Sequence, residues 1–197
     1  NERMFYILES LKEISNEMKV KFGSREPSRK PDWTEENPIG LKQEDAISIA
    51  RDLNRHQASM FVLFHQYQKH HWLVEGPQFR DLHLYLEDSY NAVHKELDAI
   101  AERITVLGAI PSASPKALTE ASYVEHEPEG YFPIRQMLDH DMKMERAICK
   151  MLRHTISRAQ KAGDFGSATL LKQVLMSAED RAHHLDHYLA EDGLRQS

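Results

Sequence analysis

Residues 70–109 read HHWLVEGPQFRDLHLYLEDSYNAVHKELDAIAERITVLGA, and this stretch decides the fold of the 197-residue chain. Between residues 81 and 107 the apolar side chains recur at steps of three, four or seven, which predicts one long helix with a single buried stripe. The stripe contains Leu82, Leu86, Val93, Leu97, Ile100, Ile104 and Leu107. Similar periodicity is found at about residues 41–72, 133–162 and 166–190. We therefore expect an all-α fold built on a four-helix bundle.

The polar residues beside this stripe combine imidazoles and carboxylates, a ligand set that suits iron better than magnesium or calcium. His83 and Glu87 are four residues apart, as are Asp98 and Glu102, so each pair shares one face of the helix. The pairs are about 22 Å apart along the axis, so one ion cannot contact both within a chain. An antiparallel two-fold contact would bring His83 and Glu87 of one chain to Asp98 and Glu102 of another. Each residue alone is more simply a solvated polar position, but the whole set favours a metal site.

This stretch resembles the Dps family (DNA-binding proteins from starved cells), which are small ferritin-like iron-storage proteins. The motifs that carry the resemblance are His71-Trp72, Gly76-Pro77-Gln78-Phe79, Leu82-His83, Asp98 to Glu102-Arg103 and Leu107-Gly108. It implies a hollow dodecamer in which His71 and His83 of one subunit, with Asp98 and Glu102 of its neighbour, form a ferroxidase centre. The expected activity is oxidation of Fe(II) by hydrogen peroxide, or more slowly by oxygen, with storage of the Fe(III) mineral. Such a protein protects against oxidative stress because it removes both reactants of hydroxyl-radical chemistry.

One ligand position departs from the family pattern. Glu87 stands where the family usually has Asp, so the charge is kept but the reach of the carboxylate changes. In the family, the residue equivalent to Trp72 lies beside the iron centre and takes up oxidising equivalents. Zinc is expected to compete with iron, because imidazole and carboxylate ligands discriminate weakly between the two metals.

Other histidines and acids are weaker candidates. His94 lies on the ligand side of its helix, and His183 and His187 have the i, i+4 spacing of a metal site, with Asp180 one turn earlier. A polar helix terminus explains these last residues equally simply. By resemblance, Asp164 at a helix–helix turn lines an acidic pore. His56 and His65 are expected to be hydrogen-bonded structural residues, and His70, about 100° from His71, to lie at the surface or behind the ligands.

The domain organisation follows from composition and turn signals. We expect an N-terminal extension at residues 1–38, with an amphipathic helix over 3–21 followed by a linker, then the ferritin-like bundle at 39–192 and a tail at 193–197. After Gly108 a connection of about 24 residues crosses the bundle. Within it, Ser114-Pro115 predicts a short helix over 114–121. A ferritin-type site inside one bundle is disfavoured, because the four helices contain no Glu-x-x-His motif.

The composition of the chain limits the macromolecules and membranes to which it is expected to bind. The net charge of −6 disfavours DNA, and residues 1–40 hold seven basic and eight acidic side chains. A nucleoid-binding structural protein with weak ferroxidase activity is the alternative function. No run of 18 apolar residues is present, so no membrane association is expected. The single Cys149 is predicted to be a buried core residue, which suits a cytoplasmic location, with nucleoid association left open.

Overall fold

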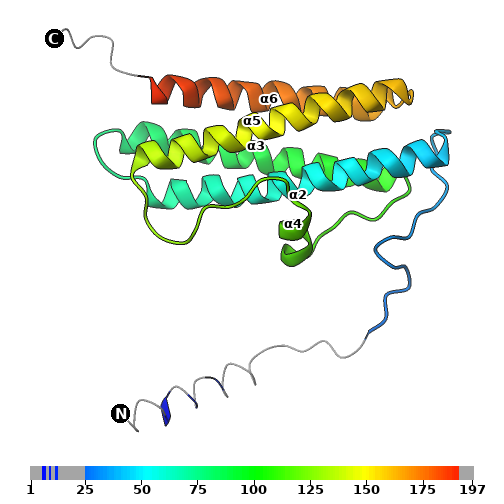
Figure 1. Cartoon of the computed structure of the whole chain (residues 1–197), viewed down its shortest axis with the longest axis horizontal. Helices are drawn as coiled ribbons and strands as arrows, with labels where there is room; N and C mark the ends of the chain where they lie inside the picture. The colour runs from blue at the N-terminus through cyan, green and yellow to red at the C-terminus, as the bar shows by residue number, and fades with distance from the viewer. Residues whose placement is uncertain (1–5, 8, 10–11, 13–24, 191–197) are drawn as a thin grey trace. The chain divides into compact units, whose positions relative to one another are not determined.

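The computed structural model describes residues 6, 7, 9, 12 and 25–190, and it divides the chain into two units, residues 1–30 and 31–197. The helix expected over residues 3–21 lies largely outside the described residues, and the tail at 193–197 lies wholly outside them. The helices of the second unit are α2 (Gln43–Leu73), α3 (Phe79–Val106), α4 (Pro115–Ala121), α5 (Ile134–Lys161) and α6 (Phe165–Leu189). The predicted all-α four-helix bundle with a short crossover helix is therefore confirmed (Figure 1).

The four long helices form two antiparallel pairs. Helix α2 packs mainly on α3, and α5 packs mainly on α6, because a short turn joins the members of each pair. The pairs meet where α2 contacts α5 and α3 contacts α6. The crossover from α3 to α5 runs back along the bundle, and α4 rests on α2 (Figure 1). Ser114 caps α4 as predicted, since its side chain accepts a hydrogen bond from the backbone N–H of Ala117 at 3.2 Å.

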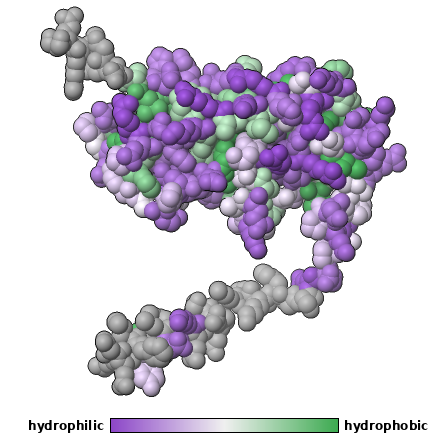
Figure 2. Space-filling view, in the orientation of Figure 1, coloured by the Kyte–Doolittle hydropathy of each residue, from purple (hydrophilic) through white to green (hydrophobic). Residues whose placement is uncertain are grey.

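The core is made by the apolar stripes of the four long helices. Six of the seven apolar positions predicted for α3 are buried, and the seventh, Leu97, is partly buried against them. Cys149 is also buried, as predicted. The face seen in Figure 2 is mostly hydrophilic, as amphipathic helices packed around one core require. Among the described helices, none combines the length and apolar character that a bilayer-spanning segment needs.

A short extended segment ties the chain before α2 to the end of α3. The backbone N–H of Glu35 donates to the carbonyl of Gly108 at 2.8 Å, and Thr34 forms an antiparallel bridge with Ala109. Gly108 has a φ of +81°, and a Cβ built there would lie 2.3 Å from the Glu35 carbonyl oxygen. Only glycine satisfies both conditions, which gives the Leu-Gly motif a structural reason. Residues 31–38 thus pack with the bundle.

Candidate metal centre

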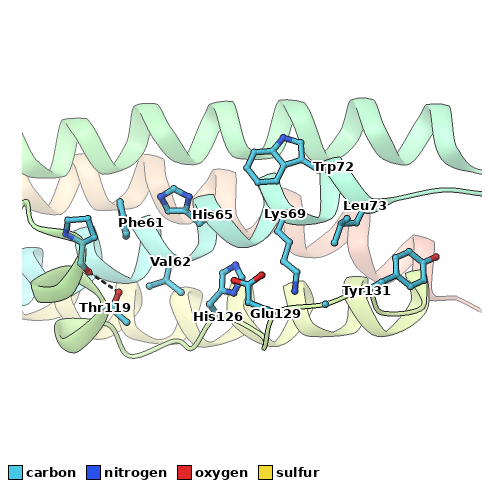
Figure 3. Close-up of a pocket in the computed structure, with 12 residues that line it drawn as sticks. Phe61, Val62, His65, Lys69, Trp72, Leu73, Thr119, His126, Glu129 and Tyr131 are labelled. Atoms are coloured by element: carbon cyan, nitrogen blue, oxygen red, sulfur yellow. Dashed lines mark hydrogen bonds between the residues drawn. The ribbon is translucent and has the colours of Figure 1, made fainter. Parts of the chain in front are cut away.

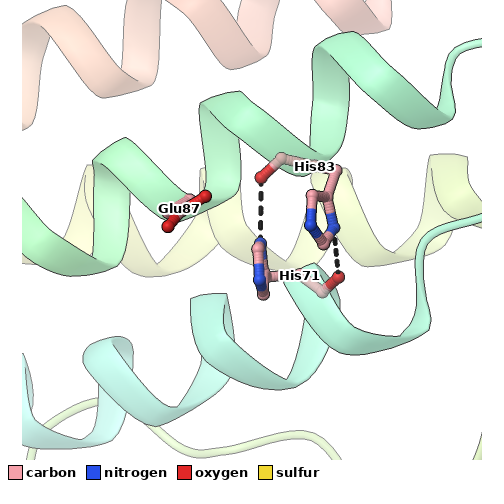
Figure 4. A group of neighbouring side chains, drawn as sticks. All are labelled: His71, His83 and Glu87. Atoms are coloured by element: carbon pink, nitrogen blue, oxygen red, sulfur yellow. Dashed lines mark hydrogen bonds between the residues drawn. The ribbon is translucent and has the colours of Figure 1, made fainter.

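His71, His83 and Glu87 come together where α2 and α3 meet. The turn at residues 74–78 reverses the chain, so the last turn of α2 lies against the first turns of α3. Each of the three side chains is half-buried and offers one ligand atom, and these atoms all lie within 4.8 Å of one another (Figure 4). We call these three residues the outer cluster. The described residues contain no other group of three or more potential ligands this close.

Reciprocal hydrogen bonds fix both imidazoles. Nδ1 of His71 donates to the carbonyl of His83 at 2.9 Å, and Nδ1 of His83 donates to the carbonyl of His71 at 2.9 Å (Figure 4). A carbonyl oxygen can only accept, so Nδ1 carries the proton in each ring and Nε2 is left with its lone pair. The rings stack with centroids 3.7 Å apart and 22° between their planes. Both histidines are therefore held in the tautomer that binds a metal through Nε2.

Aromatic rings flank this cluster. Tyr90 lies edge-on to His71, with ring centroids 5.3 Å apart, and Phe79 lies 4.9 Å from the ring of His83. Trp72 is 66% exposed, and within residues 25–190 its ring contacts neither histidine ring. Trp72 instead lines a mainly apolar pocket of about 850 Å³ between α2 and the crossover (Figure 3). The outer cluster does not line that pocket.

The other predicted ligands of α3 do not join the outer cluster within one chain. Asp98 and Glu102 are exposed on α3, 11 and 15 residues beyond Glu87. His94 is also exposed, and its ring lies 5.5 Å from that of Phe64. The separation within one chain agrees with the predicted need for a second copy.

The remaining candidates lie elsewhere. The rings of His183 and His187 are 4.3 Å apart on the exposed side of α6, near the exposed Asp180, and they border a pocket of about 450 Å³. Asp164 is buried at the start of α6, where its carboxylate accepts hydrogen bonds from Arg103 at 2.6 Å and from the backbone N–H of Ser167 at 2.9 Å. It caps the helix and neutralises Arg103, and its role in a pore stays a prediction.

Comparison with known proteins places this geometry in a family. The sequence model of the ferritin-like domain matches residues 50–194. A nutrient stress-induced DNA-binding protein of Synechococcus is 40% identical over 161 residues, which cover 82% of this chain and 92% of the relative. A DNA protection during starvation protein of Halobacterium salinarum is 41% identical over 142 residues, or 72% and 78% of the two chains.

The chain belongs to the Dps family of ferritin-like proteins.

Solved Dps structures agree with this assignment. The Dps homologue of Halobacterium salinarum superimposes with a TM-score of 0.84 at 34% identity, covering 89% of this chain and 98% of that one. DpsC of Streptomyces coelicolor gives a TM-score of 0.84 at 26% identity, covering 87% and 100%. The expected resemblance to the Dps family is therefore confirmed.

The bundle interior of this Dps protein holds a second set of charged residues, which sequence reasoning missed. Glu145 is fully buried; it accepts hydrogen bonds from the Tyr67 hydroxyl at 2.8 Å and from Nε of Arg181 at 2.5 Å. Arg181 also contacts Glu96 at 3.1 Å. Burial alone lowers the pKa of Arg181, but the carboxylates of Glu145 and Glu96 more than offset this, so its net pKa lies above the usual range.

His70 belongs to the same interior. It is fully buried, so the surface, one of the two places expected for it, is excluded. Nδ1 lies 2.8 Å from Asp141 and Nε2 lies 2.9 Å from Glu127, which also accepts from Lys69 at 2.7 Å. Burial lowers the pKa of His70, but these carboxylates, Asp141 foremost, raise it above its ordinary value. We call these interacting side chains inside the bundle the interior cluster, which consists of Lys69, His70, Glu96, Glu127, Asp141, Glu145 and Arg181.

The helical period did contain a signal for this cluster. Asp141 and Glu145 fall on the same stripe of α5 as Met137, Met144 and Ile148, so two acids were directed inward with the core. His56 is hydrogen-bonded as expected, to the Tyr123 hydroxyl and to Thr155 at 2.8 Å each. The same expectation for His65 is wrong. Its exposed ring packs edge-on against neighbouring phenylalanines and has no hydrogen-bond partner within residues 25–190.

Proposed function

We propose that this chain is the subunit of a ferroxidase that binds Fe(II) at the outer cluster, has it oxidised by hydrogen peroxide or more slowly by oxygen, and stores the Fe(III) mineral inside a hollow dodecamer. The observation that carries the proposal is the pair of imidazoles whose Nε2 atoms are left free beside Glu87. Imidazole with carboxylate is a ligand set for transition metals such as Fe(II). Zinc is expected to compete for the same atoms.

The ring geometry favours two ions. An imidazole lone pair lies in the plane of its ring, so two rings stacked 3.7 Å apart and only 22° from parallel do not aim at one ion. We assign one Fe(II) to each imidazole, with the carboxylate of Glu87 as a further ligand of the centre. Two ferrous ions supply the two electrons that hydrogen peroxide accepts, and ion pairs in two-metal sites lie about 3.5–4 Å apart.

Neutralising the charge of two Fe(II) ions requires carboxylates from a second copy of the chain. Two Fe(II) ions carry four positive charges, and the outer cluster supplies one negative charge, from Glu87. Asp98 and Glu102 of the same chain are too far along α3, but the same residues of an antiparallel copy would add two negative charges. The proposed centre therefore lies between subunits, and each two-fold contact makes two of them.

Complementation tests both the chemistry and its place between subunits. Protein loaded anaerobically with Fe(II) and treated with stoichiometric hydrogen peroxide is expected to give a fast ferric absorbance and a soluble ferric core. The variants His71→Ala and Asp98→Ala should each lose the fast phase. Co-assembled from an equal mixture, they should recover about a quarter of the wild-type sites, because half the contacts are mixed and each mixed contact holds one intact centre. No recovery would place the centre within one chain, and fast oxidation in the double variant would refute the proposal.

A DNA role is the second candidate, and the names of the Synechococcus and Halobacterium relatives favour it. The net charge of −6 opposes it, since phosphate contacts depend on basic side chains. A gel shift at low salt, repeated without residues 1–38, decides between them. A shift that survives moderate salt and requires these residues would establish DNA binding, with a cytoplasmic, nucleoid-associated location.

We keep His94 in this proposal as a residue that contacts the iron or its waters, and the pair His183 and His187, with Asp180, as a secondary metal site. The exposed imidazoles 4.3 Å apart on α6 are the observation that favours the second of these. Zinc titration of the His183→Ala variant tests it, since loss of one ligand should remove a weak site and leave the outer cluster unchanged.

A further inference from the structure

Tyr90 borders the outer cluster without belonging to it. It lies on α3 three residues after Glu87, and so on the same side of the helix. Its ring meets the ring of His71 edge-on, with centroids 5.3 Å apart and planes at 80°. The ring of Phe64 also lies edge-on to it, with centroids 5.9 Å apart and planes at 85°. The half-buried phenol therefore contacts both a proposed iron ligand and an apolar ring.

The Tyr90 hydroxyl is free to react. Within residues 25–190 it has no hydrogen-bond partner, whereas the hydroxyls of Tyr67 and Tyr85 donate to Glu145 and to the Arg181 carbonyl. A phenol O–H that no acceptor holds can give up its hydrogen atom without breaking a protein hydrogen bond. This property separates Tyr90 from the buried tyrosines of the bundle.

The other aromatic residues near the outer cluster are less suited to give an electron. Phe79 contacts His83, but a phenyl ring has no O–H and resists oxidation. Trp72 is adjacent to His71 in sequence, yet it is 66% exposed and turned to the pocket of Figure 3. Among the described residues, Tyr90 is the oxidisable side chain whose ring contacts a histidine of the outer cluster.

We propose that Tyr90 supplies the missing electron when only one Fe(II) occupies the centre. This inference rests on the proposed ferroxidase function. One Fe(II) reduces hydrogen peroxide by one electron, which gives Fe(III), hydroxide and a hydroxyl radical. The Tyr90 O–H then transfers its hydrogen atom to that radical, so water and a tyrosyl radical form. A second Fe(II), with one proton from water, later returns the phenol and leaves a second hydroxide. The sum is two Fe(II) and one hydrogen peroxide converted to two Fe(III) and two hydroxide ions.

The reaction is tested with the full-length assembly at low loading. Protein carrying one Fe(II) for every two centres is mixed with one equivalent of hydrogen peroxide and frozen within milliseconds for electron paramagnetic resonance. We expect a tyrosyl signal whose hyperfine pattern narrows when the protein is made with ring-deuterated tyrosine. In Tyr90→Phe, which keeps the ring and removes the O–H, the signal should disappear and spin-trapped hydroxyl radical should rise severalfold.

Matched variants make the result specific. Tyr131→Phe removes an exposed phenol that hydrogen-bonds Glu75, and it should keep the wild-type radical. Cobalt(II) binding, read from its visible spectrum, checks that the outer cluster of Tyr90→Phe is intact. A radical that persists in Tyr90→Phe and vanishes in Trp72→Phe would overturn the inference in favour of the indole. Fast oxidation at full loading with no radical at low loading would overturn the inference alone, whereas absence of oxidation at any loading would overturn the proposed function with it.

Discussion

The outer cluster and the interior cluster both combine histidine with carboxylates, and they differ in what balances their charge. In the interior every carboxylate has a basic side chain as its partner: Arg181 for Glu145 and Glu96, Lys69 for Glu127, and His70 for Asp141. In the outer cluster Glu87 has no cationic partner among the described residues. The same residue types therefore serve stability where the protein supplies the cation, and they serve the proposed metal binding where the protein leaves the cation out.

The largest expected effect is on the interior. Arg181→Met removes the cation and leaves Glu145 buried without a counter-charge, which should lower the free energy of unfolding by about 3–5 kcal/mol. His83→Ala should cost only about 1 kcal/mol, the usual value of a hydrogen bond lost from a half-exposed site. Urea denaturation of both variants measures the difference.

The control for this comparison is Arg146→Met, which removes an exposed arginine 3.7 Å from the exposed Asp186. It should change the free energy of unfolding by less than about 0.5 kcal/mol. Equal losses in Arg181→Met and His83→Ala would break the comparison, because the two clusters would then contribute alike to stability.

A second prediction concerns a histidine that the interior keeps neutral. Burial, with smaller contributions from the charges of Arg55 and His154, lowers the pKa of His56 from 6.5 to about 4. Between these values the unfolded chain binds more protons than the folded one, so the stabilisation is present above pH 6.5 and is lost as the pH falls toward 4. The loss should reach roughly 3 kcal/mol.

The pH effect is isolated by difference. Free energies of unfolding of the wild type and of His56→Gln, measured from pH 7 to pH 4, should converge as the pH falls, because glutamine does not titrate. Parallel curves would mean that His56 takes up its proton at the same pH in the folded and the unfolded chain, so that burial does not lower its pKa.

The smallest expected effect is on metal affinity, and it distinguishes the charge of Glu87 from the length of its side chain. Glu87→Gln keeps the length of the side chain and removes the charge, so the cobalt(II) affinity of the outer cluster should fall at least about tenfold, or about 1.4 kcal/mol. Glu87→Asp keeps the charge and should remain within a few-fold of wild type. If aspartate weakens binding as much as glutamine does, reach rather than charge sets the affinity at this position.

The sequence predicted the bundle well because each helix carries its own pattern. The stripe from Leu82 to Leu107, the cap at Ser114 and the i, i+4 spacing of His83 and Glu87 are local properties of single segments. The burial of His70 could not be predicted, for the opposite reason. Its burial depends on Asp141, 71 residues later, whose carboxylate compensates the cost of placing an imidazole in the core.

The sequence by itself determined the helices, their order, and the residue types of the candidate metal centre, since helical periodicity and covalent spacing fix which side chains share a face. Only the tertiary structure decided which nitrogen of His71 and His83 is free, because the carbonyls that hold Nδ1 come from the opposite helix. It also decided that Tyr90 rather than Trp72 contacts the ring of His71. These properties depend on how α2 and α3 approach each other, and the apolar periodicity of one helix does not determine how it packs on another.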